Sequence, residues 1–247
     1  MTVLTNESDI EKLRESGKII REIFSWLEKR VQEGVSTAEL DRGIEEIICE
    51  GGGEPAFKGY KGYPATICAS VNEVVVHGIP SEDIILHPGD IIGVDVGVKK
   101  NGFYADAART YSVGSISVEA KHLVEVAEEC LKKGTRQAVA GNRVSDISHA
   151  IESVAKREGL EEVRTFVGHG IGRSLHESPE VPNWGEKGKG PVLKEGLLLA
   201  IEPMINAGTR KIKVLEDGWT AVTLDGRLSA HFENTVMVGR KEAEIIT

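Results

Sequence analysis

The chain has 247 residues, of which 40% are hydrophobic and 28% are charged, as is typical of a soluble globular protein with a buried core. Its formal net charge of −9 and its pI of about 5.4 exclude a general affinity for nucleic acid or for anionic membranes. The sequence has no membrane-length apolar run, no targeting segment and only three widely spaced cysteines, so we expect a cytoplasmic protein without disulfides.

The first part of the chain predicts two helices followed by strands. Apolar residues recur at helical spacing from Ile10 to Val31, and Ser36 to Glu39 has the pattern of a capping box that starts a second helix. Gly51 to Gly53 end that helix. Short β-branched runs then predict four strands, at Ala65–Val71, Val74–His77, Asp90–Val98 and Phe103–Val113. We expect Lys99 to Gly102 to form a four-residue hairpin loop.

The same order of elements returns in the second part. Helices are predicted at Ser117–Ala140 and Ser145–Lys156, and strands at Leu197–Ile205, Trp219–Leu224 and Leu228–Val238. Two halves of about 1–115 and 116–247, each running helix, helix, strands, indicate an internal duplication. Gly89 precedes Asp95 by six residues, as Gly196 precedes Glu202. Since no linker separates the halves, we expect a single domain with one core.

Asp95 lies inside the apolar run Ile91–Val98, where a lone carboxylate is costly to bury. With a four-residue loop, the hairpin places Asp95 directly opposite Asp106, with Cβ atoms about 5 Å apart. Two carboxylates that close repel each other unless a cation or a shared proton lies between them. The alternative is that Asp106 is an exposed strand end and that Asp95 pairs with Arg109; a shifted register would also separate the two acids.

Two more acids lie in apolar strand-like runs, Glu202 after Leu197–Ile201 and Glu233 in Ala230–Val236. Each alone is more often a buried structural acid, but four such acids in two matched halves favour a metal site. His169 lies among the glycines of Gly168–Gly172, and the absence of an HExxH motif excludes a zincin. His231 shares a strand face with Glu233 and is a candidate for supporting it.

In this order, these residues resemble the methionine aminopeptidase family. The resemblance covers nearly the whole chain and includes Lys61–Pro64, Asn72–Pro80, Asp95, Asp106, Gly168–Gly172, His176–Glu177, Ile201–Pro203 and Phe232–Thr235. It implies the α+β pita-bread fold, with pseudo-two-fold halves and an antiparallel sheet flanked by helices. A start close to the first helix, with no large insertion, resembles the short bacterial type I enzymes.

The resemblance implies two divalent metal ions: Co²⁺, Mn²⁺ or Fe²⁺, with Zn²⁺ as a further candidate. Asp106 and Glu233 would bridge them, Asp95 would complete one ion's ligands, and His169 and Glu202 the other's. A bridging water, hydroxide-like at neutral pH, would attack the scissile carbonyl. The resemblance implies that Glu202 transfers the proton and that His176 stabilises the carbonyl oxygen. It places His77 near the scissile nitrogen.

The family's methionine pocket corresponds to apolar and aromatic residues here, together with the two catalytic histidines: Phe57, Tyr60, Tyr63, Cys68, His77, Leu175, His176 and Trp219. Many relatives have Cys where this chain has Phe57, Phe where it has Leu175, and Thr where it has Gly97. The resemblance also extends to one Na⁺ or K⁺ ion behind the site, near Asn72, Val74 and Ser229.

By resemblance, the chain is a monomeric enzyme that removes the initiator methionine from nascent proteins and associates transiently with the ribosome. An X-Pro aminopeptidase or prolidase has the same fold and ligands but usually carries a separate N-terminal domain, for which this chain has no room. A non-catalytic pita-bread binding protein would typically have lost ligands, and all five are present here. A Met-Ala-Ser peptide offered beside an Ala-Pro peptide separates these three possibilities.

Overall fold

The computed structural model describes all residues from 1 to 247 and has an α+β fold, as predicted. The helices are α1 (Glu7–Arg30), α2 (Thr37–Glu50), α3 (Val118–Thr135) and α4 (Val144–Arg157), with a short 3₁₀ turn at Tyr60–Gly62. The strands of the first half are β1 (Glu54–Pro55), β2 (Ile67–Val71), β3 (Val74–Val76), β4 (Ile91–Lys100) and β5 (Phe103–Ser112). Those of the second half are β6 (Glu161–Glu162), β7 (Gly168–Gly170), β8 (Glu177–Val181), β9 (Leu198–Ile201), β10 (Met204–Asn206), β11 (Ile212–Val214), β12 (Ala221–Thr223), β13 (Ser229–His231), β14 (Asn234–Met237) and β15 (Glu244–Ile245).

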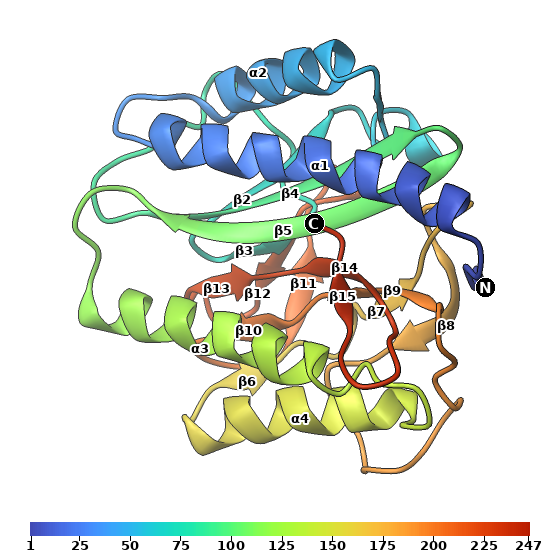
Figure 1. The fold of residues 1–247 in the computed structure, drawn as a ribbon. Helices are drawn as coiled ribbons and strands as arrows, with labels where there is room; N and C mark the ends of the chain where they lie inside the picture. Colours follow the sequence, from blue (N-terminus) through green and yellow to red (C-terminus); the bar gives the residue numbers. More distant parts are fainter.

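The strands lie between two pairs of helices. Figure 1 shows α1 and α2 on one side of the long β4–β5 hairpin and α3 and α4 on the opposite side of the strands. Every strand pair is antiparallel, in sheets ordered β1-β4-β2 with β5 on β4, β13-β10-β6, β11-β12-β3 and β15-β14-β9-β7-β8. No helix combines the length and the apolar character that a membrane span needs. Each half contributes a helix pair and strands, while their origin by duplication within a single domain stays a prediction.

The helix boundaries follow local capping signals. The Ser36–Glu39 capping box is confirmed, and Asn6, which the sequence analysis did not single out, caps α1 by accepting a hydrogen bond from the Asp9 amide. The predicted extension of α3 to Ala140 is wrong, because the helix ends at Thr135. Residues beyond it pair with another part of the chain: the Ala140 amide donates to the Gly239 carbonyl. This pairing satisfies the backbone group in place of another helical turn.

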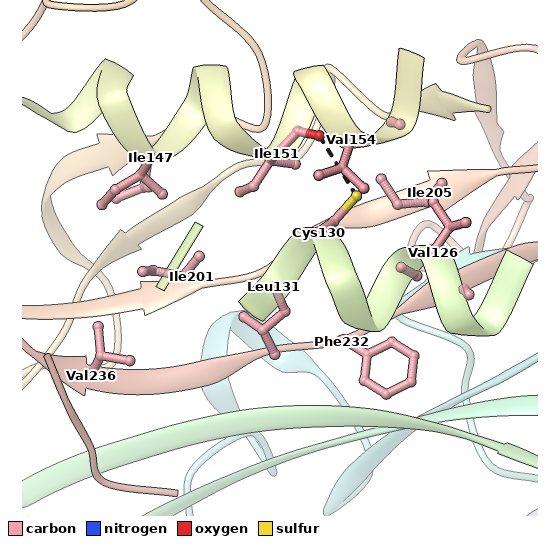
Figure 2. Packing of buried hydrophobic residues seen from close by; sticks show 14 of the residues in the cluster. Val126, Cys130, Leu131, Ile147, Ile151, Val154, Ile201, Ile205, Phe232 and Val236 are labelled. Atoms are coloured by element: carbon pink, nitrogen blue, oxygen red, sulfur yellow. Dashed lines mark hydrogen bonds between the residues drawn. The ribbon is translucent and has the colours of Figure 1, made fainter. Parts of the chain in front are cut away.

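Two apolar clusters fix the helices on the strands. One has 18 buried residues beneath α1 and α2, against β2, β4 and β5. The other has 25 buried residues, in which α3 and α4 pack on β9, β10, β13 and β14. Figure 2 shows the second cluster, where the Cys130 thiol of α3 donates to the Ile151 carbonyl of α4 at 3.6 Å. Burial of these side chains provides the main stabilisation of the helix–strand layers.

The β4–β5 hairpin has a different register from the predicted one. Lys100 pairs with Phe103, so the turn contains only Asn101 and Gly102, both with positive φ (52° and 80°). Such a two-residue turn is typical of Asn-Gly. Asp106 therefore lies opposite Gly97, and Asp95 opposite Ala108, so the predicted direct pairing of the two acids is wrong. The shift is two residues, and the acids stay on one face as diagonal neighbours.

Two predicted strands of the second half are each interrupted at an acid. The run Leu197–Ile205 divides into β9 and β10 at Glu202–Pro203, and the run Leu228–Val238 divides into β13 and β14 at Phe232–Glu233. Proline has no N–H for a sheet, and the Pro203 carbonyl accepts the Phe232 amide across the two breaks. The Glu233 amide donates to the Ala108 carbonyl of β5 instead of continuing its own ladder.

Candidate metal centre and its pocket

The five predicted metal ligands converge between the two halves. Asp95 and Asp106 come from the hairpin, His169 from β7, and Glu202 and Glu233 from the two strand breaks. Donor atoms of Asp106, His169 and Glu233 lie within 4.8 Å of one another. The His169 Nε2 atom is 3.6 Å from a Glu202 carboxylate oxygen, and the carboxyl groups of Asp95 and Asp106 are within hydrogen-bonding reach.

Contacts between the halves hold the backbone at these ligands. The Thr235 hydroxyl accepts a hydrogen bond from the Asp106 amide and donates one to the Asp106 carbonyl, both at 2.8 Å. The half-buried Arg109 guanidinium donates to the Glu233 carbonyl and to the Asn234 side chain. The Asn183 amide group donates to the Glu202 carbonyl at 3.0 Å. These bonds satisfy groups that the broken strands leave without ladder partners.

The acids repel one another strongly without a cation. Burial raises the pKa of Asp95 from 3.8 to about 7, and burial together with the Glu233 and Asp95 charges holds the pKa of Asp106 well above its ordinary value. Burial and neighbouring carboxylates do the same for the pKa values of Glu202 and Glu233. One oxygen each of Asp95, Asp106 and Glu233 is buried without a hydrogen-bond partner. This donor set fits divalent metal ions, which would satisfy the orphaned oxygens and offset the repulsion.

The His169 imidazole presents a neutral nitrogen to the acids. Its Nδ1 atom lies 2.8 Å from the Gly170 carbonyl, which can only accept, so Nδ1 carries the hydrogen and Nε2 presents its lone pair toward the acids. Burial, reinforced by His176, lowers the pKa of His169 to about 4. His231, the candidate supporting residue, is buried with Nε2 4.0 Å from a Glu233 oxygen, which is too long for a hydrogen bond.

One pocket opens onto this centre. Its wall contains all five predicted ligands, every residue predicted for the methionine pocket, and one further residue, Lys61: Phe57, Tyr60, Lys61, Tyr63, Cys68, His77, Asp95, Asp106, His169, Leu175, His176, Glu202, Trp219 and Glu233. Lys61 belongs to the Lys61–Pro64 motif, but the family resemblance implies no role for it. Its position in that motif was the only available signal, since nothing in its residue type distinguishes it from other lysines.

The apolar wall explains two departures from the family pattern. Phe57, Tyr63, Cys68 and Leu175 are buried in one cluster. A Cβ atom at Gly97 would lie 2.6 Å from Cε1 of Phe57, closer than real atoms approach. Gly97 thus leaves the space that the Phe57 ring occupies. Phe57 and Gly97, two of the three positions at which the sequence departs from the family pattern, are therefore in contact.

The two catalytic candidates outside the ligand set both line the pocket. His77 has a left-handed backbone (φ 60°), and its ring meets those of Phe166 and Trp219 edge-on at 5.0 and 6.3 Å. His176 is exposed, stacks on Tyr60 at 5.2 Å, and has Nδ1 3.0 Å from the Tyr60 hydroxyl. Its ring is 4.3 Å from the His169 ring, so it can face a group bound at the ligands.

The residues predicted for a monovalent cation lie behind the centre. The Ser229 amide donates to the Asn72 carbonyl at 2.9 Å, and the Asn72 side-chain oxygen accepts from the Ile91 amide at 3.1 Å. Val74 pairs with Val222 between β3 and β12. The structure thus brings Asn72 and Ser229 into contact, while the cation itself stays a prediction.

The comparisons with known proteins agree with this geometry. The model of metallopeptidase family M24 matches residues 11–240. A methionine aminopeptidase of Clostridium acetobutylicum is 50% identical over 247 residues, covering 100% of this chain and 99% of the relative. The crystal structure of a methionine aminopeptidase from Thermotoga maritima superposes with a TM-score of 0.98 at 42% identity, covering 100% of this chain and 99% of the other.

A prolidase from Pyrococcus furiosus shares the fold alone, with a TM-score of 0.80 at 22% identity; this chain covers 65% of its length. The pita-bread fold expected from the sequence is therefore confirmed. Because the family model spans nearly the whole chain and a relative is 50% identical over its full length, the chain belongs to metallopeptidase family M24.

Proposed function

We propose that this chain is a bacterial-type methionine aminopeptidase that removes the initiator methionine from nascent proteins and peptides by metal-dependent hydrolysis. The observation that carries the proposal is one pocket in which a five-residue donor set meets an apolar aromatic wall. Relatives that share 40–50% of its sequence over nearly the full length are methionine aminopeptidases. The X-Pro alternative is not favoured, because the prolidase likeness extends to the fold only.

Two divalent ions would be held by Asp95, Asp106, His169, Glu202 and Glu233, with Asp106 and Glu233 shared between them. The carboxylate-rich set suits Mn²⁺, Fe²⁺ or Co²⁺, with Zn²⁺ as a further candidate. When bound, such ions polarise the scissile carbonyl and lower the pKa of water. A Na⁺ or K⁺ ion near Asn72, Val74 and Ser229 is the remaining cofactor that we propose.

Three residues of the chain carry out the remaining catalytic steps. Glu202 holds and transfers the proton, which suits a carboxyl whose pKa is raised by burial. The imidazole of His176 is oriented by Tyr60, which leaves Nε2 to donate to the carbonyl oxygen. His77 lies beside Trp219 at the pocket wall and would contact the scissile nitrogen.

The substrate's side chain would occupy the apolar part of the pocket. Phe57, Tyr63 and Trp219 offer aromatic edges and faces, and a thioether makes favourable contacts with such rings. Tyr60, Cys68 and Leu175 complete the wall. The free amino group of the substrate would lie near Asp95, which limits cleavage to the first peptide bond.

The setting in the cell follows from this substrate. We infer a monomer that acts in the cytoplasm and meets nascent chains through a transient association with the ribosome. The acidic pI of about 5.4 gives no reason to expect nucleic-acid specificity.

Substrate choice tests the proposal. The protein, loaded in turn with Mn²⁺ or Co²⁺, is offered Met-Ala-Ser and Ala-Pro peptides, and free amino acids are quantified. We expect release of methionine only. Cleavage of the Ala-Pro peptide alone would replace the proposal with an X-Pro peptidase, and no cleavage with any metal would favour a binding protein.

The His176→Ala variant tests the division of labour. We expect kcat to fall by about 10²- to 10³-fold, because a donor to the developing negative charge is lost. The metal content, measured by mass spectrometry, should stay at the wild-type value. A loss of metal instead would make His176 a ligand and overturn this assignment.

A further inference from the structure

We propose that Lys61 binds a carboxylate of the substrate just beyond the scissile bond, so that the enzyme prefers peptides with an acidic group there. The inference rests on the proposed function, since it concerns the same pocket. It assigns a specificity-determining role to the one pocket residue that has no role among the predicted ligands and methionine-pocket residues.

Lys61 lies at the outer end of the pocket. The wall residues Phe57, Tyr63 and Cys68 are buried, whereas Lys61 and His176 are exposed. The side chain of an N-terminal methionine would fill the buried part, so the rest of the peptide leaves past the exposed residues. Lys61 is the only lysine or arginine in the pocket wall.

The backbone holds Lys61 in place. It occupies a left-handed conformation (φ 49°, ψ 21°) within a tight turn. The turn is closed by bonds from the Gly59 amide to the Tyr63 carbonyl at 2.7 Å and from the Tyr63 amide to the Tyr60 carbonyl at 2.9 Å. A non-glycine residue in this conformation is uncommon and needs support from its surroundings. The buried Tyr63 hydroxyl, 2.9 Å from the Ile67 carbonyl, ties the turn to β2.

The charge of Lys61 has no anionic partner within the protein. The Lys61 ammonium lies 5.4 Å from the centroid of the Tyr60 ring and makes no ion pair. Lys58, three residues earlier, is paired with Glu45 at 2.7 Å. One of two neighbouring lysines is thus neutralised, and the one beside the pocket is free.

Position and charge together identify the ligand. Tyr60 joins Lys61 to His176, the residue that would face the scissile carbonyl, so a cation beside Tyr60 meets the first or second residue after that bond. As the only basic residue of the pocket wall, Lys61 attracts a carboxylate to the outer end of the pocket. The carboxylate can belong to an Asp side chain or to the C-terminus of a short peptide.

Peptide pairs that differ only in this charge provide the test. Met-Ala-Asp-Ser amide is compared with Met-Ala-Asn-Ser amide, and Met-Ala-Ser acid with its amide, so that the side-chain and C-terminal sources are distinguished. At low salt, wild-type protein should favour the charged member of at least one pair by about two- to fivefold in kcat/KM, as expected for an exposed ion pair. The preference should lie in KM and should diminish in 0.5 M NaCl, where screening is strong.

Variants make the test specific to Lys61. Lys61→Gln should remove the preference and Lys61→Glu should reverse it, while the control Lys58→Gln should keep it. An unchanged ratio in both Lys61 variants would overturn the inference, as would equal cleavage of both members of each pair by wild-type protein. If the variants do not fold, the wild-type ratios at low and high salt still decide. No cleavage of the neutral peptides would overturn the proposed function, and this inference with it.

Discussion

The two pairs of acids in the candidate metal centre lie on different kinds of backbone, one pair in regular strands and the other at strand breaks. Asp95 and Asp106 lie within two uninterrupted ten-residue strands of one hairpin, where sequence neighbours pair with each other. Glu202 and Glu233 lie at breaks, where the backbone bonds leave the local ladder and reach Ala108, Arg109 and Asn183. The centre thus combines a rigid, locally specified half with a half whose geometry depends on the rest of the molecule.

This difference separates two ways of damaging the centre. A change at a hairpin acid removes a proposed ligand but leaves the strand pairing intact, because the ladder does not involve the side chain. A change at a residue that supports a break moves a ligand without removing it.

The largest effect is expected from Asp106→Asn, which replaces a proposed bridging ligand in the regular hairpin. Activity should fall by at least ~10³-fold, since a few kcal/mol of lost stabilisation corresponds to that factor. The melting temperature of the metal-free protein should not fall, because one of several repelling carboxylates is gone. Glu180→Gln is the control, an exposed acid opposite His169 in the β7–β8 pair that should leave activity unchanged. A variant that melts much earlier would show that the hairpin is not locally specified.

Removal of the metal should make stability strongly pH-dependent. Burial raises the pKa of Asp95 to about 7, and the other three acids are raised by burial and by one another. Above pH 4 the native state therefore holds protons that the unfolded state has released, and stability falls as pH rises from 5 to 8. For Asp95 this is at most about 4 kcal/mol.

The measurement is a melting curve in chelator across this range. We expect the melting temperature to fall by several °C between pH 5 and 8, and we expect added Mn²⁺ to reverse this fall. Asp106→Asn and Glu233→Gln should each flatten the dependence. A rise in stability with pH would mean that the acids are not buried together.

A moderate effect is expected from Arg109→Met, which supports the break at Glu233. The loss leaves the Glu233 carbonyl and the Asn234 side chain without their donor, and we expect a cost of about 2–4 kcal/mol. Metal affinity, measured by calorimetry, should fall about 10- to 100-fold although no ligand is changed. The control is Arg30→Met, at an arginine that only stacks on Trp26. This variant should change neither the stability nor the metal affinity. Unchanged affinity in Arg109→Met would place the support of Glu233 elsewhere.

The smallest effect concerns the hairpin next to the pocket. Gly97→Ala should destabilise the protein by about 1–3 kcal/mol, because the new Cβ meets Phe57 and Ala56. Phe57→Cys in the same chain should recover at least about 1 kcal/mol in a urea-unfolding cycle. Gly93→Ala is the control, since its Cβ would meet nothing nearer than 3.7 Å. Additive costs in the double variant would contradict the compensation between Gly97 and Phe57.

The sequence predicted the hairpin more securely than its register. Asn101–Gly102 carries the signal of a two-residue turn, but the lysines before it look like loop residues, although they extend β4 as far as Lys100. The breaks at Glu202 and Glu233 were beyond local patterns, because their donors and acceptors come from distant segments such as Ala108. The four acids could be singled out because a carboxylate inside an apolar strand is unusual wherever the strand ends. His169, and the role of all five residues as metal ligands, follow from the family resemblance and stay a proposal.

Lys61, in contrast to the acids, could not be singled out from the sequence. A lysine in a polar turn is ordinary in any sequence, and only the folded pocket separates it from Lys58. Side chains whose role depends on an absent partner are therefore the least visible from sequence.

The two reciprocal hydrogen bonds between Asp106 and Thr235 have a consequence for the synthesis and folding of the enzyme. The two residues are 129 positions apart, and Glu233 lies beside the later one. During synthesis, the hairpin acids are made early, whereas the segment with Glu233 and Thr235 is made almost last. We therefore expect a growing copy of this protein to be inactive until residue 235 has left the ribosome and the late strands have docked on the hairpin.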